Sequence, residues 1–210
     1  MPNPFTQATP AKCANIVLAL AALLPVTGCH VDANKNSSNE KVSISTPFGD
    51  MSVKTDENAV GQGVGLPVYP GATLINKENN GHDDGAADVN MSFGSFHLGV
   101  KAVTYRSQDD PGKVLTFYRK NMTKYGTVIE CNGQRLVSGS PASTEDGLTC
   151  TDDNHRKVHV QEDSSEEQLK AGSRQHQHIV SVIKKDGYTK ISLLALDLPS
   201  GFGDGSSSSQ

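Results

Sequence analysis

The sequence contains no tryptophan and few aromatic side chains of any kind. Its 210 residues include 5 Tyr and 6 Phe. A broad platform of rings for stacking sugars or nucleic-acid bases is therefore not expected. An excess of basic charge is also lacking, because 19 Lys and Arg face 23 Asp and Glu, for a formal net charge of −4. General nucleic-acid binders are usually basic, so the composition argues against that class.

The N-terminal hydrophobic run is too short to span a membrane. It covers residues 13–24, about 12 positions, whereas a membrane-spanning helix needs about 20. Before it lies a polar segment in which Lys12 is the only charged residue, an arrangement typical of a secretory signal peptide. After it comes a region suited to cleavage, Leu24-Pro25-Val26-Thr27-Gly28-Cys29.

This region resembles the lipobox of bacterial lipoproteins, with Val26, Thr27, Gly28 and Cys29 in register. The resemblance implies that the Cys29 thiol receives a diacylglyceryl group and that cleavage follows Gly28. It also implies acylation of the new amino terminus, with palmitate the expected acyl group. Residues 1–28 would then be the signal peptide. The alternative is an ordinary signal peptide followed by a chance cysteine.

A lipidated Cys29 predicts where the protein resides. Two or three acyl chains anchor a protein stably, whereas a single chain binds a membrane only marginally. We therefore expect a lipid-anchored protein of the bacterial cell envelope, facing the periplasm. The resemblance implies that, in a Gram-negative cell, an Asp directly after the lipidated Cys would signal retention in the inner membrane. His30 stands there instead, which favours the outer membrane.

Two of the four cysteines remain for another role once Cys13 leaves with the signal peptide and Cys29 carries lipid. In an oxidising compartment, Cys131 and Cys150 predict one disulfide that closes a loop of about 20 residues. A catalytic or metal-binding pair is the alternative. It is less favoured because neither Cys has a CxxC partner or a His motif nearby.

The composition divides the exported chain into three parts. Residues 29–41 are polar and are expected to form the lipidated Cys and a flexible tether. Residues 42–199 are expected to form a single domain. Residues 200–210 are rich in Gly and Ser and predict a disordered tail.

Alternating apolar residues over 42–45 and 51–54 predict a short hairpin, and strands are expected near 89–94 and 97–106. The segment 110–125 predicts a helix with one apolar face, since Pro111 stands in its first turn and Gly126 follows its end. The glycines of 61–65 do not predict a phosphate loop, because prolines follow at once. We expect an α+β fold, an antiparallel sheet with one main amphipathic helix packed on it.

Two dipeptides predict tight hairpin turns in the C-terminal half, Asn132-Gly133 and Asp186-Gly187. A two-residue turn at the second would place Lys185 opposite Tyr188. The same register pairs Val180 with Leu193, Val182 with Ile191, and His178 with Ala195. The side of the sheet with the valines is then expected to face the helix.

A second resemblance concerns about residues 66–198. The segment Leu66-Pro67-Val68-Tyr69-Pro70-Gly71-Ala72 precedes a strand that ends Thr104-Tyr105, and the helix that follows contains Phe117-Tyr118 with Gly126 behind it. This pattern is similar to a module of uncharacterised bacterial secreted proteins with a "YPGA" entry and an "FY…G" helix. It implies no activity.

Three groups of polar residues are candidate sites, each with a structural alternative. His176 and His178 would share one face of a strand and could start a zinc or copper site, or act as structural histidines. The segment 76–88 carries acids that could bind calcium or be solvated, without the regular ligand spacing. These acids are Glu78, Asp83, Asp84 and Asp88.

The third group is the basic outer face of the predicted helix, which could meet anionic headgroups or be solvated. It comprises Lys113, Arg119, Lys120 and Lys124. No motif for covalent or metal-dependent hydrolysis occurs. We therefore expect a non-catalytic binding or structural module without a cofactor, with the membrane and an envelope protein as candidate partners. A periplasmic metal- or small-ligand-binding protein is the alternative, and a hydrolase without a recognisable motif is a weaker one.

Overall fold

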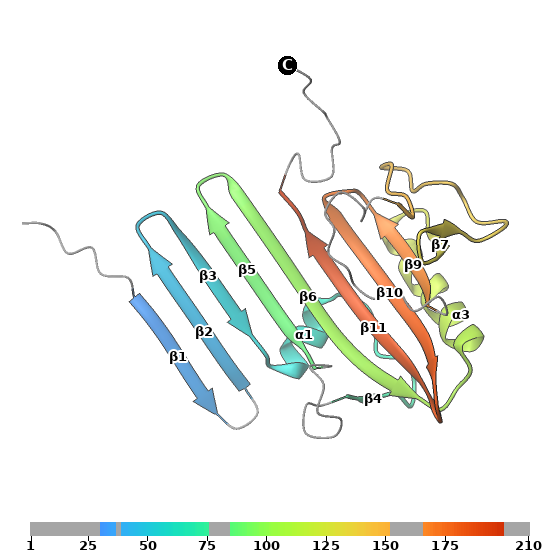
Figure 1. The fold of residues 1–210 in the computed structure, drawn as a ribbon, viewed down its shortest axis with the longest axis horizontal. Coiled ribbons are helices and arrows are strands. Elements are labelled where there is room, and N and C mark those ends of the chain that lie inside the picture. Colours follow the sequence, from blue (N-terminus) through green and yellow to red (C-terminus); the bar gives the residue numbers. More distant parts are fainter. Residues whose placement is uncertain (1–29, 37–38, 76–84, 152–165, 200–210) are drawn as a thin grey trace, which may run out of the picture.

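The computed structural model describes residues 30–36, 39–75, 85–151 and 166–199. One antiparallel sheet of 11 strands dominates these residues, and helices are few (Figure 1). The predicted antiparallel sheet is confirmed. The predicted signal peptide, Cys29 and the C-terminal tail lie outside the described residues, as do Glu78, Asp83 and Asp84.

The strands follow one another along the chain mostly as hairpins. In chain order they are β1 His30–Asn36, β2 Asn39–Thr46, β3 Gly49–Lys54, β4 Thr73–Leu74, β5 Ala87–Phe93, β6 Phe96–Ser107, β7 Ile129–Asn132, β8 Arg135–Leu136, β9 Glu167–Gly172, β10 His176–Lys185 and β11 Tyr188–Asp197. Across the sheet the order is β1-β2-β3-β5-β6-β11-β10-β9-β7-β8, with β4 paired to β6. The central pair, β6 and β11, thus joins the two halves of the chain.

The turn at Asp186-Gly187 sets the register of β10 and β11 as predicted. Lys185 pairs with Tyr188, Val180 with Leu193, and Val182 with Ile191. Gly187 has φ of 83°, in the left-handed region that a tight hairpin turn requires. The other predicted turn, at Asn132-Gly133, joins β7 to β8.

The predicted helix is present as α3, Pro111–Met122, and continues as a 3-10 turn, η1, over Thr123–Tyr125. Gly126 ends it with φ of 102°. Asp110 occupies the N-cap position, but its side chain makes no capping hydrogen bond. Its carboxylate lies 3.5 Å from Lys184 Nζ on β10 instead, so it links the helix start to the sheet.

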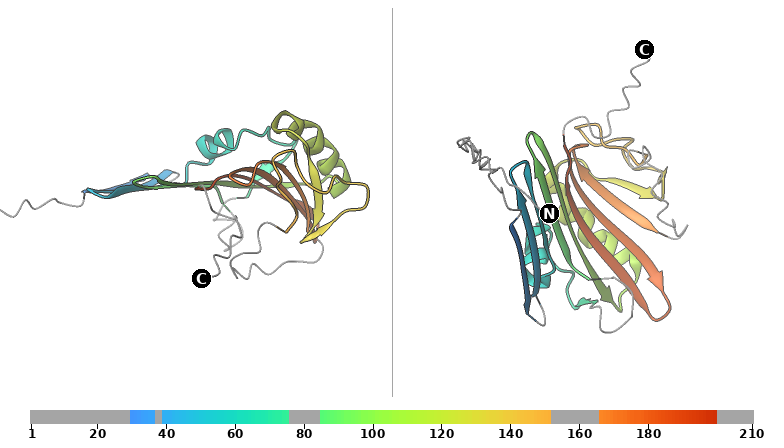
Figure 2. Two further views of the ribbon diagram at one scale, coloured as in Figure 1. Left: turned by 90° about the horizontal axis from the view of Figure 1, so that it is seen from above. Right: turned by 60° about the vertical axis from the view of Figure 1, so that its left-hand side comes forward.

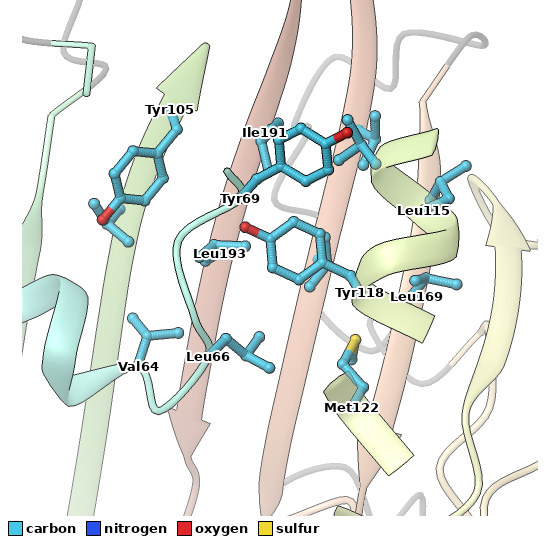
Figure 3. Packing of buried hydrophobic residues seen from close by; sticks show 14 of the residues in the cluster. Val64, Leu66, Tyr69, Tyr105, Leu115, Tyr118, Met122, Leu169, Ile191 and Leu193 are labelled. Carbon is cyan, nitrogen blue, oxygen red and sulfur yellow. The ribbon is translucent and has the colours of Figure 1, made fainter. Parts of the chain in front are cut away.

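The main core lies between α3 and the strands beside it (Figure 3). Tyr118 and Met122 are fully buried there, and they face Leu193 of β11 and Leu169 of β9. Burying side chains of this size contributes about 1.5–3 kcal/mol each. The residues of this core are spread over 60–193 in the chain.

A second helix, α1 over Glu57–Gly63, lies on the same side of the sheet (Figure 2). The sequence did not predict it, because its glycines are typical of a loop. Val60 and the following Val64 are buried in the core, and this burial stabilises a helix of low intrinsic propensity. Gly61 permits close packing, since a Cβ there would lie 2.8 Å from Tyr105 Oη on β6.

The prediction of a flexible tether over 29–41 is wrong for the residues that the structure describes. β1 begins at His30 and pairs with β2 over its full length, from His30 opposite Ser45 to Asn36 opposite Asn39. Backbone pairing with a neighbouring strand thus orders a segment whose composition alone is typical of a linker. The domain accordingly starts at β1 and not at residue 42.

Candidate functional site

The residues of the "YPGA…FY…G" pattern meet in one structural cluster. The ring of Tyr69 lies edge-on to Phe117 at 5.2 Å between centroids, and Phe117 lies edge-on to Tyr118 at 5.1 Å. Edge-to-face aromatic pairs stabilise a core beyond the area that they bury. This part of the pattern therefore has a packing role.

Asp109 ties the same cluster to the sheet. Its Oδ2 accepts a hydrogen bond of 2.8 Å from Tyr69 Oη, and its Oδ1 accepts one of 3.2 Å from Lys113 Nζ. These hydrogen bonds hold the pKa of the Asp109 carboxyl below its usual value. Its backbone carbonyl accepts a hydrogen bond of 2.6 Å from Thr189 Oγ1 on β11. Asp109 thus joins the segment before β4, the start of α3, and β11.

His176 and His178 share the helix side of β10 but engage different partners. His176 Nδ1 lies 2.9 Å from Asp197 Oδ1. The ring of His178 stacks on Tyr125 of η1, with the centroids 3.5 Å apart. Burial and the nearby Lys124 charge lower the pKa of His178. No group of three or more His, Cys, Asp or Glu placed to hold a metal ion occurs within residues 30–36, 39–75, 85–151 and 166–199.

The predicted disulfide between Cys131 and Cys150 is confirmed, with the two Cα atoms 5.7 Å apart. Cys131 lies in β7, and its side chain is buried together with Ile129. The bond fastens the segment after β8 to the edge of the sheet. This gives the two cysteines a structural role.

The basic side chains of α3 have partners that the helix sequence alone does not reveal. Lys113 pairs with Asp109, and Arg119 with Glu130 of β7. Lys124 Nζ donates to the carbonyl of Gly65 at 2.6 Å. Three of the four predicted membrane-contact residues are therefore engaged within the molecule, and Lys120 is exposed.

Of the acidic loop, only Asp88 lies within the described residues. It belongs to β5, where Asn90 Nδ2 donates to its Oδ1. Two shallow hollows, of about 300 and 360 Å³, lie at the start of β7 and beside α1. The first is lined by Arg119 and Glu130, which pair with each other, and by Ser140, whose hydroxyl accepts a hydrogen bond from Glu130 N. Their polar groups thus already have partners.

The most distinctive surface lies on the N-terminal half of the sheet. We call this part the wing, meaning β1, β2, β3, β5 and residues 96–100 of β6. α1 contacts one end of β5, and from there the wing extends beyond both helices as a single layer (Figure 2). The cross-strand pairs place apolar residues opposite one another on the side away from the helices, which we call the wing face. They are Val31, Ala33, Val42, Ile44, Met51, Val53, Val89, Met91, Phe93, Phe96, Leu98 and Val100.

The wing face is partly open to solvent. The exposed fraction is 58% for Val31, 38% for Val42 and 43% for Phe93. The side chains that the structure describes on this face are uncharged, but the pairing also aligns Lys35 with Glu40 in the same alternation, at the end of β1 and β2 away from His30. The helix side of the same strands carries the polar residues, among them Asp32, Asp50, Ser52 and Asn90.

One end of the wing carries both the start of β1 and the turns of two hairpins. A continuous row of paired residues crosses β1, β2, β3, β5 and β6 there. We call it the anchor row: His30, Ser45, Asp50, Ser92 and His97. Beyond it lie the β2–β3 turn with Phe48, which is 84% exposed, and the β5–β6 turn between Phe93 and Phe96.

Sequence reasoning found the β2–β3 hairpin but missed the wing face. The signal was present, because apolar residues alternate with polar ones in β2, β3 and β5. The alternation within one strand does not tell which side of the sheet its apolar residues share with the next strand. Only the pairing of the strands shows that they lie on one side. β1 was missed for a second reason, its polar composition.

Comparison of the chain with protein families, curated proteins and solved structures finds no match. Within the part of the chain that the structure describes, no helix has the length and hydrophobicity to cross a membrane.

Proposed function

We propose that the chain is an exported bacterial lipoprotein, anchored through Cys29 to the membrane of the cell envelope. The observation that carries this proposal is the order of the N-terminal residues. A basic residue, a short apolar run and a lipobox-like segment end at a cysteine one residue before the first strand. The folded part then faces the periplasm, with the outer membrane favoured.

Within this proposal the folded part is a non-catalytic binding or structural module of α+β type. The aromatic cluster around Tyr69, the Asp109 junction and the Cys131–Cys150 disulfide all support a stable scaffold. The paired polar groups of the hollow at β7 support a structural role for them as well. The partly exposed, apolar wing face supports binding as the activity.

The metal-binding alternative has less support than this reading. It relied on His176 and His178 acting together, and these two rings engage Asp197 and Tyr125 separately. Its acidic segment contributes only Asp88 within the described residues, in a hydrogen bond with Asn90.

The test is metabolic labelling with a fatty acid in a bacterial host. The full chain is compared with Cys29→Ser and with Cys13→Ser, a matched control in the predicted signal peptide. We expect label in the wild type and in C13S and none in C29S. Label retained in C29S, or absent from the wild type, would overturn the proposal.

A further inference from the structure

Within the part of the chain that the structure describes, both helices lie on the other side of the sheet from the wing face (Figure 2). An antiparallel sheet with one solvated side normally keeps its polar residues on that side. In the wing the polar residues lie on the helix side, and the opposite side is apolar. An apolar surface that is half-buried in its middle and exposed at Val31, Val42, Phe93 and Phe96 is typical of an interaction site.

The start of β1 ties this face to the proposed anchor. Cys29 is bonded directly to His30, so their Cα atoms are about 3.8 Å apart. His30 is the first residue of the anchor row, which crosses five strands. At about 4.8 Å between strands, the whole row lies within about 20 Å of His30. A lipid on Cys29 would therefore hold this end of the wing at the bilayer surface.

The side chains beyond the anchor row suit that position. Phe48 is 84% exposed, and Phe93 and Phe96 are 43% and 36% exposed. The Phe93 ring lies over β3, where Gly49 leaves room for it, because a Cβ at Gly49 would clash with the ring. Apolar side chains such as Phe gain free energy at the boundary between headgroups and acyl chains.

The distribution of charge selects which side can meet lipid. The helix side of the wing carries Asp32, Asp50 and Lys54, and charged groups are costly at acyl-chain depth. The part of the wing face nearest the anchor row, from Val31 across to Leu98, carries none. The end of the wing face near His30 can therefore lie against acyl chains without burying a charge, because Lys35 and Glu40 pair at the opposite end of β1 and β2. The helix side cannot, because it carries Asp32 and Asp50 at that end.

We propose that the wing face rests on the lipid surface that carries the Cys29 anchor, with Phe48, Phe93 and Phe96 at its interface. This inference rests on the proposed lipidation. A second copy packed face to face would cover Val42 and its neighbours. It would leave Phe48 uncovered, because that turn lies beyond the last paired residues of β2 and β3. The lipid surface covers both the face and the turns.

The absence of tryptophan provides a direct probe. Phe96→Trp introduces the only tryptophan of the chain on the wing face. His97→Trp is the matched control, since His97 is the next residue and is exposed on the opposite side. Each full chain is produced with its signal segment, purified with its anchor, and reconstituted into phosphatidylcholine–phosphatidylethanolamine vesicles with or without brominated acyl chains.

We expect F96W to lose most of its emission in brominated vesicles and H97W to retain it. Equal emission of F96W in both kinds of vesicle would overturn the inference. If F96W is instead blue-shifted without quenching and the chain cross-links as a dimer, a second copy covers the face. Phe48→Trp provides an independent probe, because this exposed side chain contributes little to folding. It must be quenched as well.

The intact mass of each sample separates the two proposals. A chain that starts at Cys29 with lipid attached, but whose F96W is not quenched, retains the anchor and contradicts the docking of the wing. A chain without lipid contradicts the proposed function. Its F96W emission, measured after the chain is added to preformed vesicles, then shows whether the wing face binds lipid without an anchor.

Discussion

Tyr69, a residue of the "YPGA…FY…G" pattern, lies in the core and donates a hydrogen bond to Asp109. Replacing Tyr69 by Phe keeps the ring on Phe117 but removes the hydrogen bond to Asp109. We expect a lower free energy of unfolding at neutral pH. Tyr188→Phe is a control at a half-buried position and is expected to change stability little. Urea unfolding of the three chains measures this, and equal midpoints would contradict the role of the bond.

The same hydrogen bond predicts a pH dependence. The pKa of Asp109 is lowered in the folded chain, chiefly by the Tyr69 hydroxyl and by Lys113. The stability that this provides is present above the ordinary Asp value of about 4 and is lost as the pH falls through the folded value. The difference between wild type and Y69F should therefore shrink below about pH 4. A difference that grows on acidification would contradict this assignment.

His178 predicts a change at higher pH, because the folded chain prefers its neutral, unprotonated ring. Burial is the largest cause that lowers the pKa of His178, and the positive charge of Lys124 lowers it further. The unfolded chain therefore binds the proton more readily than the folded chain does. The free energy of unfolding should fall as the pH drops through about 6.5 and level off below the folded value. His178→Phe keeps a ring on Tyr125 and should lose less stability between pH 7.5 and about 5.5. An identical loss in both chains would exclude His178 as the cause.

Burial distinguishes two classes of aromatic residue in this chain. Tyr118 is fully buried, so Tyr118→Ala should cost about 3–5 kcal/mol, and Tyr118→Phe much less because the ring remains. Phe48 is 84% exposed, and Phe48→Ala should leave the free energy of unfolding nearly unchanged. Calorimetry of the three variants checks this. A large loss in F48A would show that Phe48 serves folding and not an external surface.

Among the structural elements, the disulfide loop gives the clearest expectation. Cys131 and Cys150 are separated by 19 positions, and closing such a loop stabilises the fold by about 3 kcal/mol in the chain-entropy description. The double change to Ser should lower the unfolding free energy by about that amount. The wild type in reductant should match the double variant, and no loss in either would contradict a structural role.

The elements that the sequence predicted well are those with strong local signals. Pro111 and Gly126 bound the α3–η1 helix, and the turn at Asp186-Gly187 sets one register that holds along ten pairs of β10 and β11. Such signals act within a few residues, so they can be read without the rest of the chain.

The elements that were missed depend on distant partners. α1 is stabilised by burial of Val60 and Val64 against the sheet, which no local propensity reveals. β1 is ordered by pairing with β2, although its composition is that of a linker. Strand pairing also places the apolar residues of β2, β3 and β5 together on the wing face. The candidate site is thus visible only after the strands are placed.

At the scale of the whole molecule, the sheet joins two differently built halves. The C-terminal half carries α3, the core and the disulfide, whereas the wing is a single layer that ends in the anchor row (Figure 2). The start of β1 lies at the wing's outer edge, far along the sheet from α3 (Figure 1). This arrangement places the wing, and not the basic face of α3, beside the proposed anchor.

The lipid on Cys29 is the claim from which the account of the whole molecule follows. The most direct test is the intact mass of the protein from its native membrane fraction, with and without reductant. The account predicts a chain of residues 29–210 that carries a diacylglyceryl group and an added acyl chain, and a gain of about 2 Da on reduction of the disulfide. A mass without lipid, or a chain that does not begin at Cys29, would contradict it.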